Sequence, residues 1–206
     1  MQSLLVTLKK ATFLWTMNAV LTNNYSLFGL ETERLLFRKL TWDDFDAWTN
    51  LFGSKDVAVF LGLDPKLSKK ELTQIWFDKT FNRYEKNLGS MNALIDKKSN
   101  RLIGQSGILV QTIEDEQRLE VSYSILPGFW RQGFAFEAAR ACKNNAFEKG
   151  WSENLISVIE PTNIGSERVA VKNGMRLEKT VLELHNAPFN VFSIQKEEWM
   201  SDRFRD

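Results

Sequence analysis

Cysteine and histidine are almost absent from this chain, with Cys142 and His185 as the single examples in 206 residues. One cysteine excludes an internal disulfide framework, and one of each residue leaves too few ligands for a zinc cluster, so we expect no metal. Such low cysteine use fits a reducing compartment and predicts a cytoplasmic location. Cys142 lies in an alanine-rich segment, where a free cysteine is typically a small buried residue.

A strong net charge and a long apolar run are also missing. The 27 basic and 26 acidic residues leave a net charge of +1, which gives no electrostatic case for nucleic acid as a partner. Residues 11–21 are mostly apolar, but this run is too short and too interrupted to cross a bilayer. We therefore expect neither a nucleic-acid partner nor a membrane span.

Length and composition suit one domain with an appendage. The hydrophobic fraction of 43%, with 15 Phe and 7 Trp, is enough for one packed core. We assign that domain to residues 30–206 and treat residues 1–29 as an N-terminal extension. The extension is an extra helix, a disordered segment or the product of a start codon placed too far upstream, with Met17 as an alternative start; a weak targeting segment is a further alternative.

Hydrophobic periodicity and turn residues predict a mixed α/β chain. Expected helices begin near Thr41, after the capping-box pair Ser68 and Glu71, and over 133–149 and 163–173. Expected strands cover 34–39, 91–95, 102–111, 119–126, 154–160, 176–184 and 190–197. The strand–helix–strand unit around 119–160 implies two parallel strands, and the hairpins beside it imply antiparallel ones. The fold class is thus a central mixed sheet of about seven strands with helices on both faces.

Residues 120–139 form the most informative segment, reading as a strand, a sharp turn, a glycine-bearing loop and an alanine-rich helix. Gly133 and Ala135 place small residues where the loop becomes the helix. Backbone N–H groups of such a loop and of the first helical turn can converge on an anion such as a diphosphate. The segment therefore predicts a nucleotide-like cofactor.

Five segments in order resemble the GCN5-related N-acetyltransferase (GNAT) superfamily, most closely its RimJ/RimL-like branch. They are 30–38, 102–107, 120–138, 163–175 and the closing strand 191–199, and the resemblance covers roughly 31–199. It implies acetyl-CoA as the cosubstrate and acetyl transfer to a primary amine, on a protein N-terminus or a small molecule, by direct attack in a ternary complex. It also implies a monomer or homodimer.

The same resemblance assigns the cofactor site. Its members are Leu126, Arg131, Gln132, Gly133, Phe134, Ala135, Asn163 and Ser166. Arg131 departs from the family, which frequently has glycine there. Its side chain either crowds the loop or pairs with a cofactor phosphate, and we favour the second. Asn163 would contact the pantetheine arm, and it also suits a helix N-cap.

Catalytic roles fall on Glu120 and Ser166. Glu120 matches the family's general base, either direct or through water; the alternative is a carboxylate paired with Arg118 or solvated, with Glu160 as a second candidate base. Ser166 matches a serine near the CoA sulfur and could donate to the thiolate, or simply bond its own helix backbone. A backbone N–H near Leu126 would be the oxyanion donor.

Strand alternation places Ser122 and Ser124 on the face of Glu120 and turns Tyr123 toward the core. By resemblance, the first two helices border the acceptor pocket, so that Trp48, Trp76 or Phe77 would line it. We read His185 as an exposed loop residue or a substrate contact. Two rival functions remain: a non-catalytic acyl-CoA-binding sensor or scaffold, and a membrane-peripheral or partner-binding protein acting through residues 1–30.

Overall fold

A single seven-stranded mixed sheet organises the chain, in the order β1-β2-β3-β4-β5-β7-β6. The computed structural model describes residues 25–182 and 188–203, so His185, Met17 and most of the N-terminal extension lie outside it. The strands are β1 (Leu35–Arg38), β2 (Gly89–Asp96), β3 (Arg101–Ile113), β4 (Glu116–Ile125), β5 (Asn154–Ile159), β6 (Arg176–Val181) and β7 (Phe189–Gln195). Only β4 and β5 pair in parallel among the described strands. The predicted fold class is confirmed.

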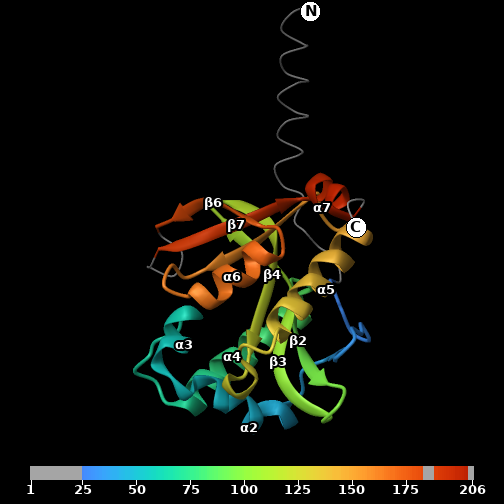
Figure 1. Ribbon diagram of the computed structural model, residues 1–206. Helices are drawn as coiled ribbons and strands as arrows, with labels where there is room; N and C mark the ends of the chain where they lie inside the picture. Colours follow the sequence, from blue (N-terminus) through green and yellow to red (C-terminus); the bar gives the residue numbers. More distant parts are fainter. Residues whose placement is uncertain (1–24, 183–187, 204–206) are drawn as a thin grey trace, which may run out of the picture.

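Helices cover both faces of this sheet (Figure 1). One layer holds η1 (Trp42–Asp44), α2 (Phe45–Trp48), η2 (Thr49–Gly53), α3 (Lys55–Phe60) and α4 (Lys69–Lys86). The other holds α5 (Phe134–Glu148), α6 (Ile164–Lys172) and α7 (Lys196–Arg203). Neighbouring β2 residues show the division, since Leu94 packs with α5 and Ala93 packs with α4. No helix among the described residues is long and apolar enough to cross a membrane.

Local sequence signals set the ends of α4. The Ser68 side chain accepts from the N–H of Glu71, and the Glu71 carboxylate accepts from the N–H of Ser68, which completes the predicted capping box. Asn87 ends the helix in the left-handed conformation, with φ of 52°. These caps fix where β2 starts, and therefore how α4 lies across the sheet.

Two predicted strands differ from the structure, and one short helix was not predicted. The closing strand, expected to run over 191–199, ends at Gln195, because Lys196 begins α7 and turns Trp199 back onto Phe147 of α5. The strand expected over 176–184 is described only as far as Val181. Helix α3 was not predicted, since six residues carry too little periodicity.

The packed unit also starts before residue 30. Tyr25 and Leu27 are 3% and 2% exposed and belong to the core beside α5. The Tyr25 ring meets Trp151 edge-on at 5.4 Å between centroids. Removing residues 25–29 would therefore open the core that supports β1.

Candidate active site

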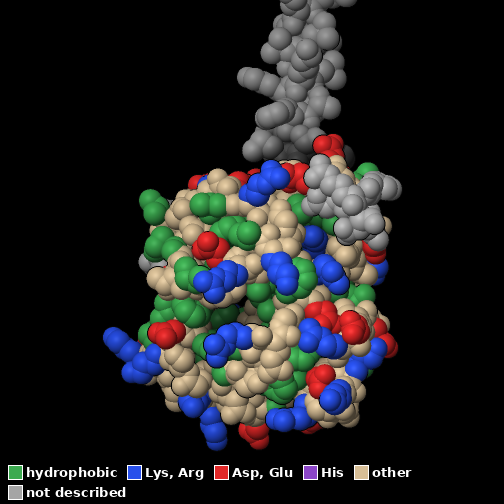
Figure 2. Space-filling view, in the orientation of Figure 1, with side chains coloured by type: hydrophobic (Ala, Val, Ile, Leu, Met, Phe, Trp, Pro, Cys, Tyr) green, Lys and Arg blue, Asp and Glu red, His purple; other side chains and the backbone are tan. Residues whose placement is uncertain are grey.

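Strands β4 and β5 separate just beyond Glu120. Their register pairs Leu119 with Leu155 and Glu120 with Ile156. Beyond that point the Ser157 hydroxyl donates to the Val121 carbonyl at 2.7 Å, in place of a strand ladder. The indole N–H of Trp130 donates to the Ile125 carbonyl at 2.6 Å. In the space-filling view the surface is hollowed below α6, with Lys and Arg side chains around the hollow (Figure 2).

Backbone groups of β4 line this separation. In a strand, the N–H and C=O of one residue point the same way, and the next residue points the opposite way. Because the carbonyls of Val121 and Ile125 face β5, the N–H and C=O of Tyr123 face that side too. An extended amide chain can bond to such an edge as an added strand does.

The expected oxyanion donor is a backbone N–H near Leu126. The N–H of Leu126 donates to the Ile103 carbonyl of β3 at 2.8 Å, so it points away from the separation. The alternation puts the N–H of Ile125 on the open side instead. That group is also near Leu126, so the expected donor stays a prediction.

Glu120 lies at the apex of the separation and is 5% exposed. Its Oε2 accepts from Gln111 Nε2 at 2.7 Å. Burial raises the pKa of this carboxyl, while the bond from Gln111, the charge of Arg83 and the N–H of Val158 act in the opposite direction. The alternative pairing with Arg118 is wrong, since that guanidinium bonds Glu178 and Asn154.

Glu160, the second candidate base, has a local structural task. Its Oε2 accepts from the backbone N–H of Thr162 at 2.8 Å and from the Thr162 hydroxyl at 2.5 Å. These bonds hold the turn from β5 into α6. Glu120, rather than Glu160, therefore lies where β4 and β5 separate.

The start of α6 brings Ser166 to the same place. Asn163 caps the helix, because its Oδ1 accepts from the N–H of Ser166 at 3.1 Å. The phenol of Tyr123 donates to the Ser166 carbonyl at 2.8 Å, which ties the first turn of α6 to β4. Tyr123 otherwise packs against the core, as its place in the strand predicts. Ser166 therefore lies beside the open edge of β4.

The predicted phosphate loop has the backbone of an anion site. It follows the single turn η3 (Pro127–Phe129) and enters α5 at Phe134. Arg131 and Gly133 have φ of 59° and 83°, in the left-handed region that glycine favours. Because Gly133 is the N-cap, no side chain caps the first turn of α5. Its N–H groups are available to a diphosphate.

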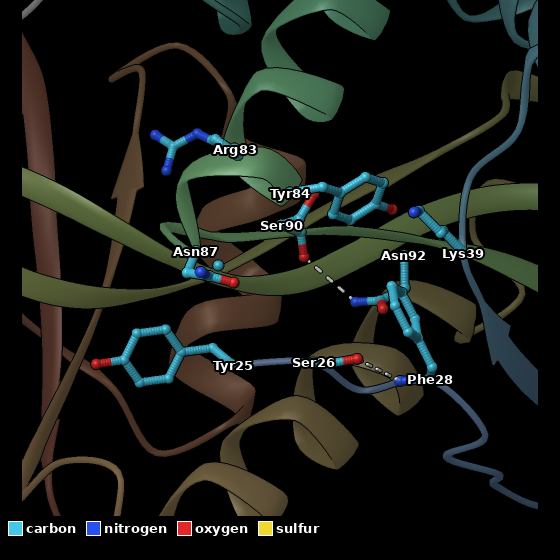
Figure 3. A pocket seen from close by; sticks show the side chains of 10 residues that line it. Tyr25, Ser26, Phe28, Lys39, Arg83, Tyr84, Asn87, Ser90 and Asn92 are labelled. Atoms are coloured by element: carbon cyan, nitrogen blue, oxygen red, sulfur yellow. Dashed lines mark hydrogen bonds between the residues drawn. The ribbon is translucent and has the colours of Figure 1, made fainter. Parts of the chain in front are cut away.

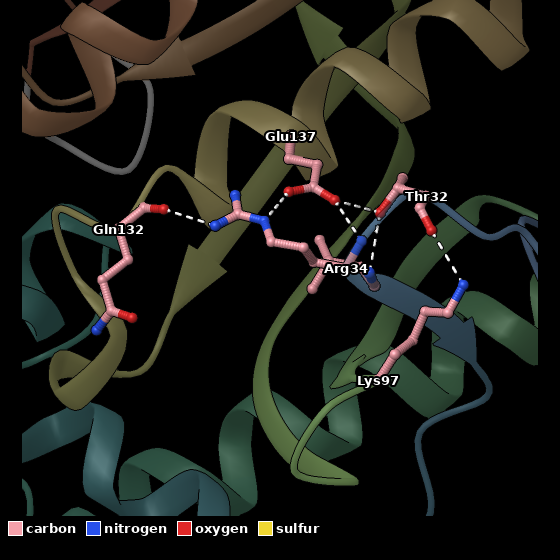
Figure 4. Close-up of polar contacts among 6 residues, drawn as sticks. Thr32, Arg34, Lys97, Gln132 and Glu137 are labelled. Atoms are coloured by element: carbon pink, nitrogen blue, oxygen red, sulfur yellow. Dashed lines mark hydrogen bonds and ion pairs between the residues drawn. The ribbon is translucent and has the colours of Figure 1, made fainter.

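Arg34 holds this loop from outside (Figure 4). Its Nη1 donates to the Gln132 carbonyl at 2.9 Å, and its Nε donates to Glu137 Oε2 at 2.6 Å. Its guanidinium also lies 4.2 Å from the centre of the Phe134 ring. The Thr32 hydroxyl completes the cluster by donating to Glu137 Oε1 at 2.5 Å. With its carbonyl turned toward Arg34, Gln132 leaves the following N–H groups on the other side of the loop.

The aromatic residues expected around the acceptor separate into two groups. Trp48 and Phe77 are fully buried within the α4 layer, so they do not line a pocket. Trp76 is half-buried and donates from Nε1 to Gln105 Oε1 at 3.1 Å. Gln105 pairs with Ser124 across β3 and β4, on the face that carries Glu120. Trp76 is thus the member of the three that reaches the site.

Cys142 has no part in this site. It is fully buried, and its Sγ lies 3.2 Å from the Ser106 hydroxyl. Burial raises the pKa of the thiol to about 12, so it stays protonated. A separate pocket of about 130 Å³ lies between residues 25–28 and the end of α4, and includes Lys39, Tyr84 and Asn92 (Figure 3). No predicted site residue lines it.

Two functional candidates were missed from the sequence. Gln111 faces α4 by the alternation of β3, but periodicity does not distinguish a site glutamine from a surface one. Arg34 lies 103 positions from Glu137, and nothing local in the sequence connects them.

A family profile and two curated relatives match this chain. The profile described as "Acetyltransferase (GNAT) domain" matches residues 34–176. The uncharacterized protein YkkB of Bacillus subtilis is 34% identical over 143 residues, covering 69% of this chain and 80% of YkkB. The uncharacterized N-acetyltransferase YoaA of the same organism is 28% identical over 173 residues, covering 81% and 96%.

Solved structures share the fold. An acetyltransferase from Agrobacterium tumefaciens aligns with a TM-score of 0.68 and 25% identity, over 83% of this chain and 96% of its own. The RimL ribosomal α-N-protein acetyltransferase, in complex with coenzyme A, aligns at 0.61 and 16%, over 80% and 95%. Spermidine N-acetyltransferase from Vibrio cholerae, with CoA and spermine, aligns at 0.63 and 16%, over 82% and 99%.

Proposed function

Because this chain belongs to the GNAT acetyltransferase family, and is thus an acetyl-CoA-dependent acetyltransferase, we propose that its acceptor is a primary amine attacked at the separation of β4 and β5. The observation that carries the proposal is the position of Glu120. A buried carboxylate with a raised pKa lies where the two strands part, on the face that also bears Ser122 and Ser124. Carboxyl groups are rarely buried in a strand without a partner or a role.

We assign cofactor binding to the loop that joins β4 to α5. Gly133, Phe134 and Ala135 would bind the diphosphate through backbone N–H groups, and the helix dipole favours the negative charge. Arg131 is exposed beside them and would add a direct charge-assisted bond to a phosphate. Gln132 shapes the loop from both ends, since its amide donates to the Gly128 carbonyl at 3.1 Å and its carbonyl accepts from Arg34.

Two side chains would carry the proton transfers. An ammonium is not a nucleophile, so the amine must first lose a proton, which Glu120 accepts directly or through a water. The amine nitrogen then forms a bond to the thioester carbonyl carbon, and the N–H of Ile125 stabilises the oxyanion. As the carbon–sulfur bond breaks, the departing thiolate takes a proton from the Ser166 hydroxyl, and the second proton released by the acetylated nitrogen restores that hydroxyl. The products are an acetylated amine and CoA.

We specify the acceptor no more narrowly than as a primary amine. Two proteins with a similar fold are named as acetyltransferases of a ribosomal protein α-amino group and of spermidine. Both of these acceptors carry primary amines. The net charge of +1 favours neither. Trp76, which bonds Gln105 on the Glu120 face, is our candidate for a contact with the acceptor.

We propose that the acetyltransferase unit covers the expected range 30–206 and also needs residues 25–29. Tyr25 and Leu27 support this extension, because they are buried in the core that backs β1 and α5. A variant that begins at Tyr25 should keep its melting temperature and acetyl-CoA affinity, whereas one that begins at Leu30 should lose stability.

Calorimetric titration with acetyl-CoA tests the cofactor site. Gly133→Asp should weaken binding well over tenfold, because a side chain at φ of 83° strains the loop and its Cβ would lie 3.4 Å from Nη2 of Arg34, the side chain that holds the loop. Equal affinity in the folded variant and the wild type would move the cofactor away from this loop.

An amine panel tests the reaction. CoA release from acetyl-CoA is followed with a polyamine, an amino sugar and short peptides with free N-termini. Amine-dependent release at a rate above the hydrolytic background supports the proposal. Tight binding without turnover on any member would favour a non-catalytic acyl-CoA-binding domain.

A further inference from the structure

Gln111 connects a half-buried cation to the buried carboxylate of Glu120. Nη2 of Arg83, on α4, donates to Gln111 Oε1 at 3.3 Å. On the other side, Gln111 Nε2 donates to Glu120 Oε2 at 2.7 Å. The three side chains come from α4, β3 and β4, so they meet only in the folded protein. They form a relay that leads from the helix layer to the strand separation.

The cation sets the direction of the amide in this relay. A guanidinium has N–H donors and no acceptor, so the oxygen of Gln111 must face Arg83. The –NH₂ group must then face Glu120 and can only donate to it. A hydrogen bond donated to a carboxylate favours its charged form, so the orientation of Gln111 opposes protonation of Glu120.

Arg83 itself is held firmly. Its Nη1 donates to the carbonyls of Leu88 at 3.2 Å and Val110 at 3.0 Å. Arg83 also borders the pocket of Figure 3, but there its guanidinium extends away from the Tyr84 ring and Lys39. The positive charge of Arg83 therefore lies toward β3 rather than in that pocket.

The other titratable side chains described around Glu120 do not bond it. On β4, Arg118 bonds Glu178, and Tyr123 is on the opposite face, where burial raises the pKa of its phenol. After β5, Glu160 bonds Thr162, and the N–H of Val158 reaches Glu120 directly. On α4, Lys79 is exposed one turn from Arg83. Arg83 is the cation whose charge acts on Glu120.

We propose that Arg83, acting through Gln111, is a positioning residue that keeps Glu120 ionised in its buried site and so available to take the proton of the amine. The inference rests on the proposed function for its catalytic meaning. Its physical content, a carboxylate held in the charged form by an oriented amide, is independent of turnover.

The test compares Gln111→Leu and Arg83→Met with wild type in two measurements. Carbon-13 NMR of labelled glutamate side chains titrates the Glu120 carboxyl, identified as the resonance missing in Glu120→Gln. Both variants should raise its pKa by about one to two units, the size of a charge-assisted hydrogen bond. The acid limb of kcat/KM should move upward equally, with the high-pH plateau kept.

Lys79→Met and Arg83→Lys act as controls beside the two test variants. Lys79→Met removes a cation from the same helix without contact to Gln111, and it should leave the carboxyl titration and the acid limb in place. Gln111→Leu keeps the bonds from Arg83 to Leu88 and Val110, so it remains informative if Arg83→Met does not fold. Arg83→Lys keeps a charge without the fork of donors, and it should give an intermediate shift.

The outcomes separate the inference from the proposed function. An unchanged Glu120 titration in Gln111→Leu overturns the relay, and so does a Lys79→Met shift as large as that of Arg83→Met. If the NMR titration shifts while the acid limb of the rate does not, the relay stands as described and Glu120 is not the base.

Discussion

Arg34 Nε and Glu137 Oε2 lie 2.6 Å apart and join the start of β1 to the first turn of α5. The same guanidinium bonds the Gln132 carbonyl in the loop that we assign to the diphosphate. One side chain therefore holds both this loop and the first turn of α5. Burial alone would raise the pKa of Glu137, but bonds from Thr32 and Arg34 outweigh it and lower that pKa. The cluster is therefore charged at neutral pH, and the loop is shaped before any ligand arrives.

Replacing Arg34 by Met should weaken acetyl-CoA binding about tenfold, equivalent to about 1.4 kcal/mol. The physical reason is that the Gln132 carbonyl is released and the loop must be ordered again on binding. Calorimetric titration measures the change. Lys97→Met is the matched control, since Lys97 contacts Glu31 and Thr32 at the edge of the same cluster without touching the loop. Equal affinities in Arg34→Met and Lys97→Met would refute a role for Arg34 in the loop.

Arg131 occupies a left-handed position that costs a non-glycine residue roughly 1 kcal/mol. If its guanidinium pairs with a phosphate, Arg131→Gln should weaken acetyl-CoA binding severalfold while leaving stability nearly unchanged. Arg131→Gly should weaken binding likewise and raise the unfolding free energy by up to about 1 kcal/mol, because the strain is relieved. Denaturant unfolding and calorimetry together distinguish the two effects. Tighter binding in both variants would mean that the side chain crowds the loop.

Glu120→Gln should stabilise the fold at neutral pH by about 1 kcal/mol, since it removes a buried charge. Burial raises the pKa of Glu120 above its ordinary value, so the folded state binds a proton more readily than the unfolded chain. Wild-type stability relative to the variant should therefore fall as pH rises from about 4.5, the ordinary value, through the folded pKa. Urea unfolding of both proteins between about pH 4 and pH 8 measures this difference. A difference that grows toward acid pH would contradict the raised pKa.

Asn163→Ala should cost about 1 kcal/mol of stability, because it removes the N-cap of α6. Asn163→Asp keeps a capping oxygen and should retain most of that stability. If Asn163 also contacts the pantetheine arm, both variants should weaken acetyl-CoA binding, since neither keeps the amide N–H. Thermal unfolding reports the cap and calorimetry reports the contact, so an Asp variant with full affinity would leave Asn163 only its structural role.

Local sequence signals predicted the parts of the fold that local physics decides. The Ser68–Glu71 capping box located α4, and the strand–loop–helix pattern located Gly133 at the start of α5. The short helix α3 carries too few turns for a periodic signal. The start of helix α7 was read as strand because Lys196, Glu197 and Glu198 carry no apolar periodicity that separates it from β7.

In the candidate site too, local signals predicted some residues and missed others. Glu120 and Ser166 were named from the sequence, and strand alternation correctly gave the face that Glu120 shares with Ser122 and Ser124. The oxyanion donor could be placed only near Leu126, because which residues of β4 bond to β3 depends on sheet register. Arg34 and Gln111 could not be found, since their roles depend on contacts between distant strands and helices.

Single-turnover kinetics of Glu120→Gln at saturating acetyl-CoA is the most direct test of the account. With an amine that the wild type acetylates, the variant should bind acetyl-CoA with unchanged affinity. It should transfer the acetyl group at least about 100-fold more slowly at neutral pH, the usual contribution of a general base. Transfer at the wild-type rate by the folded variant would contradict the account and move the base away from the separation of β4 and β5.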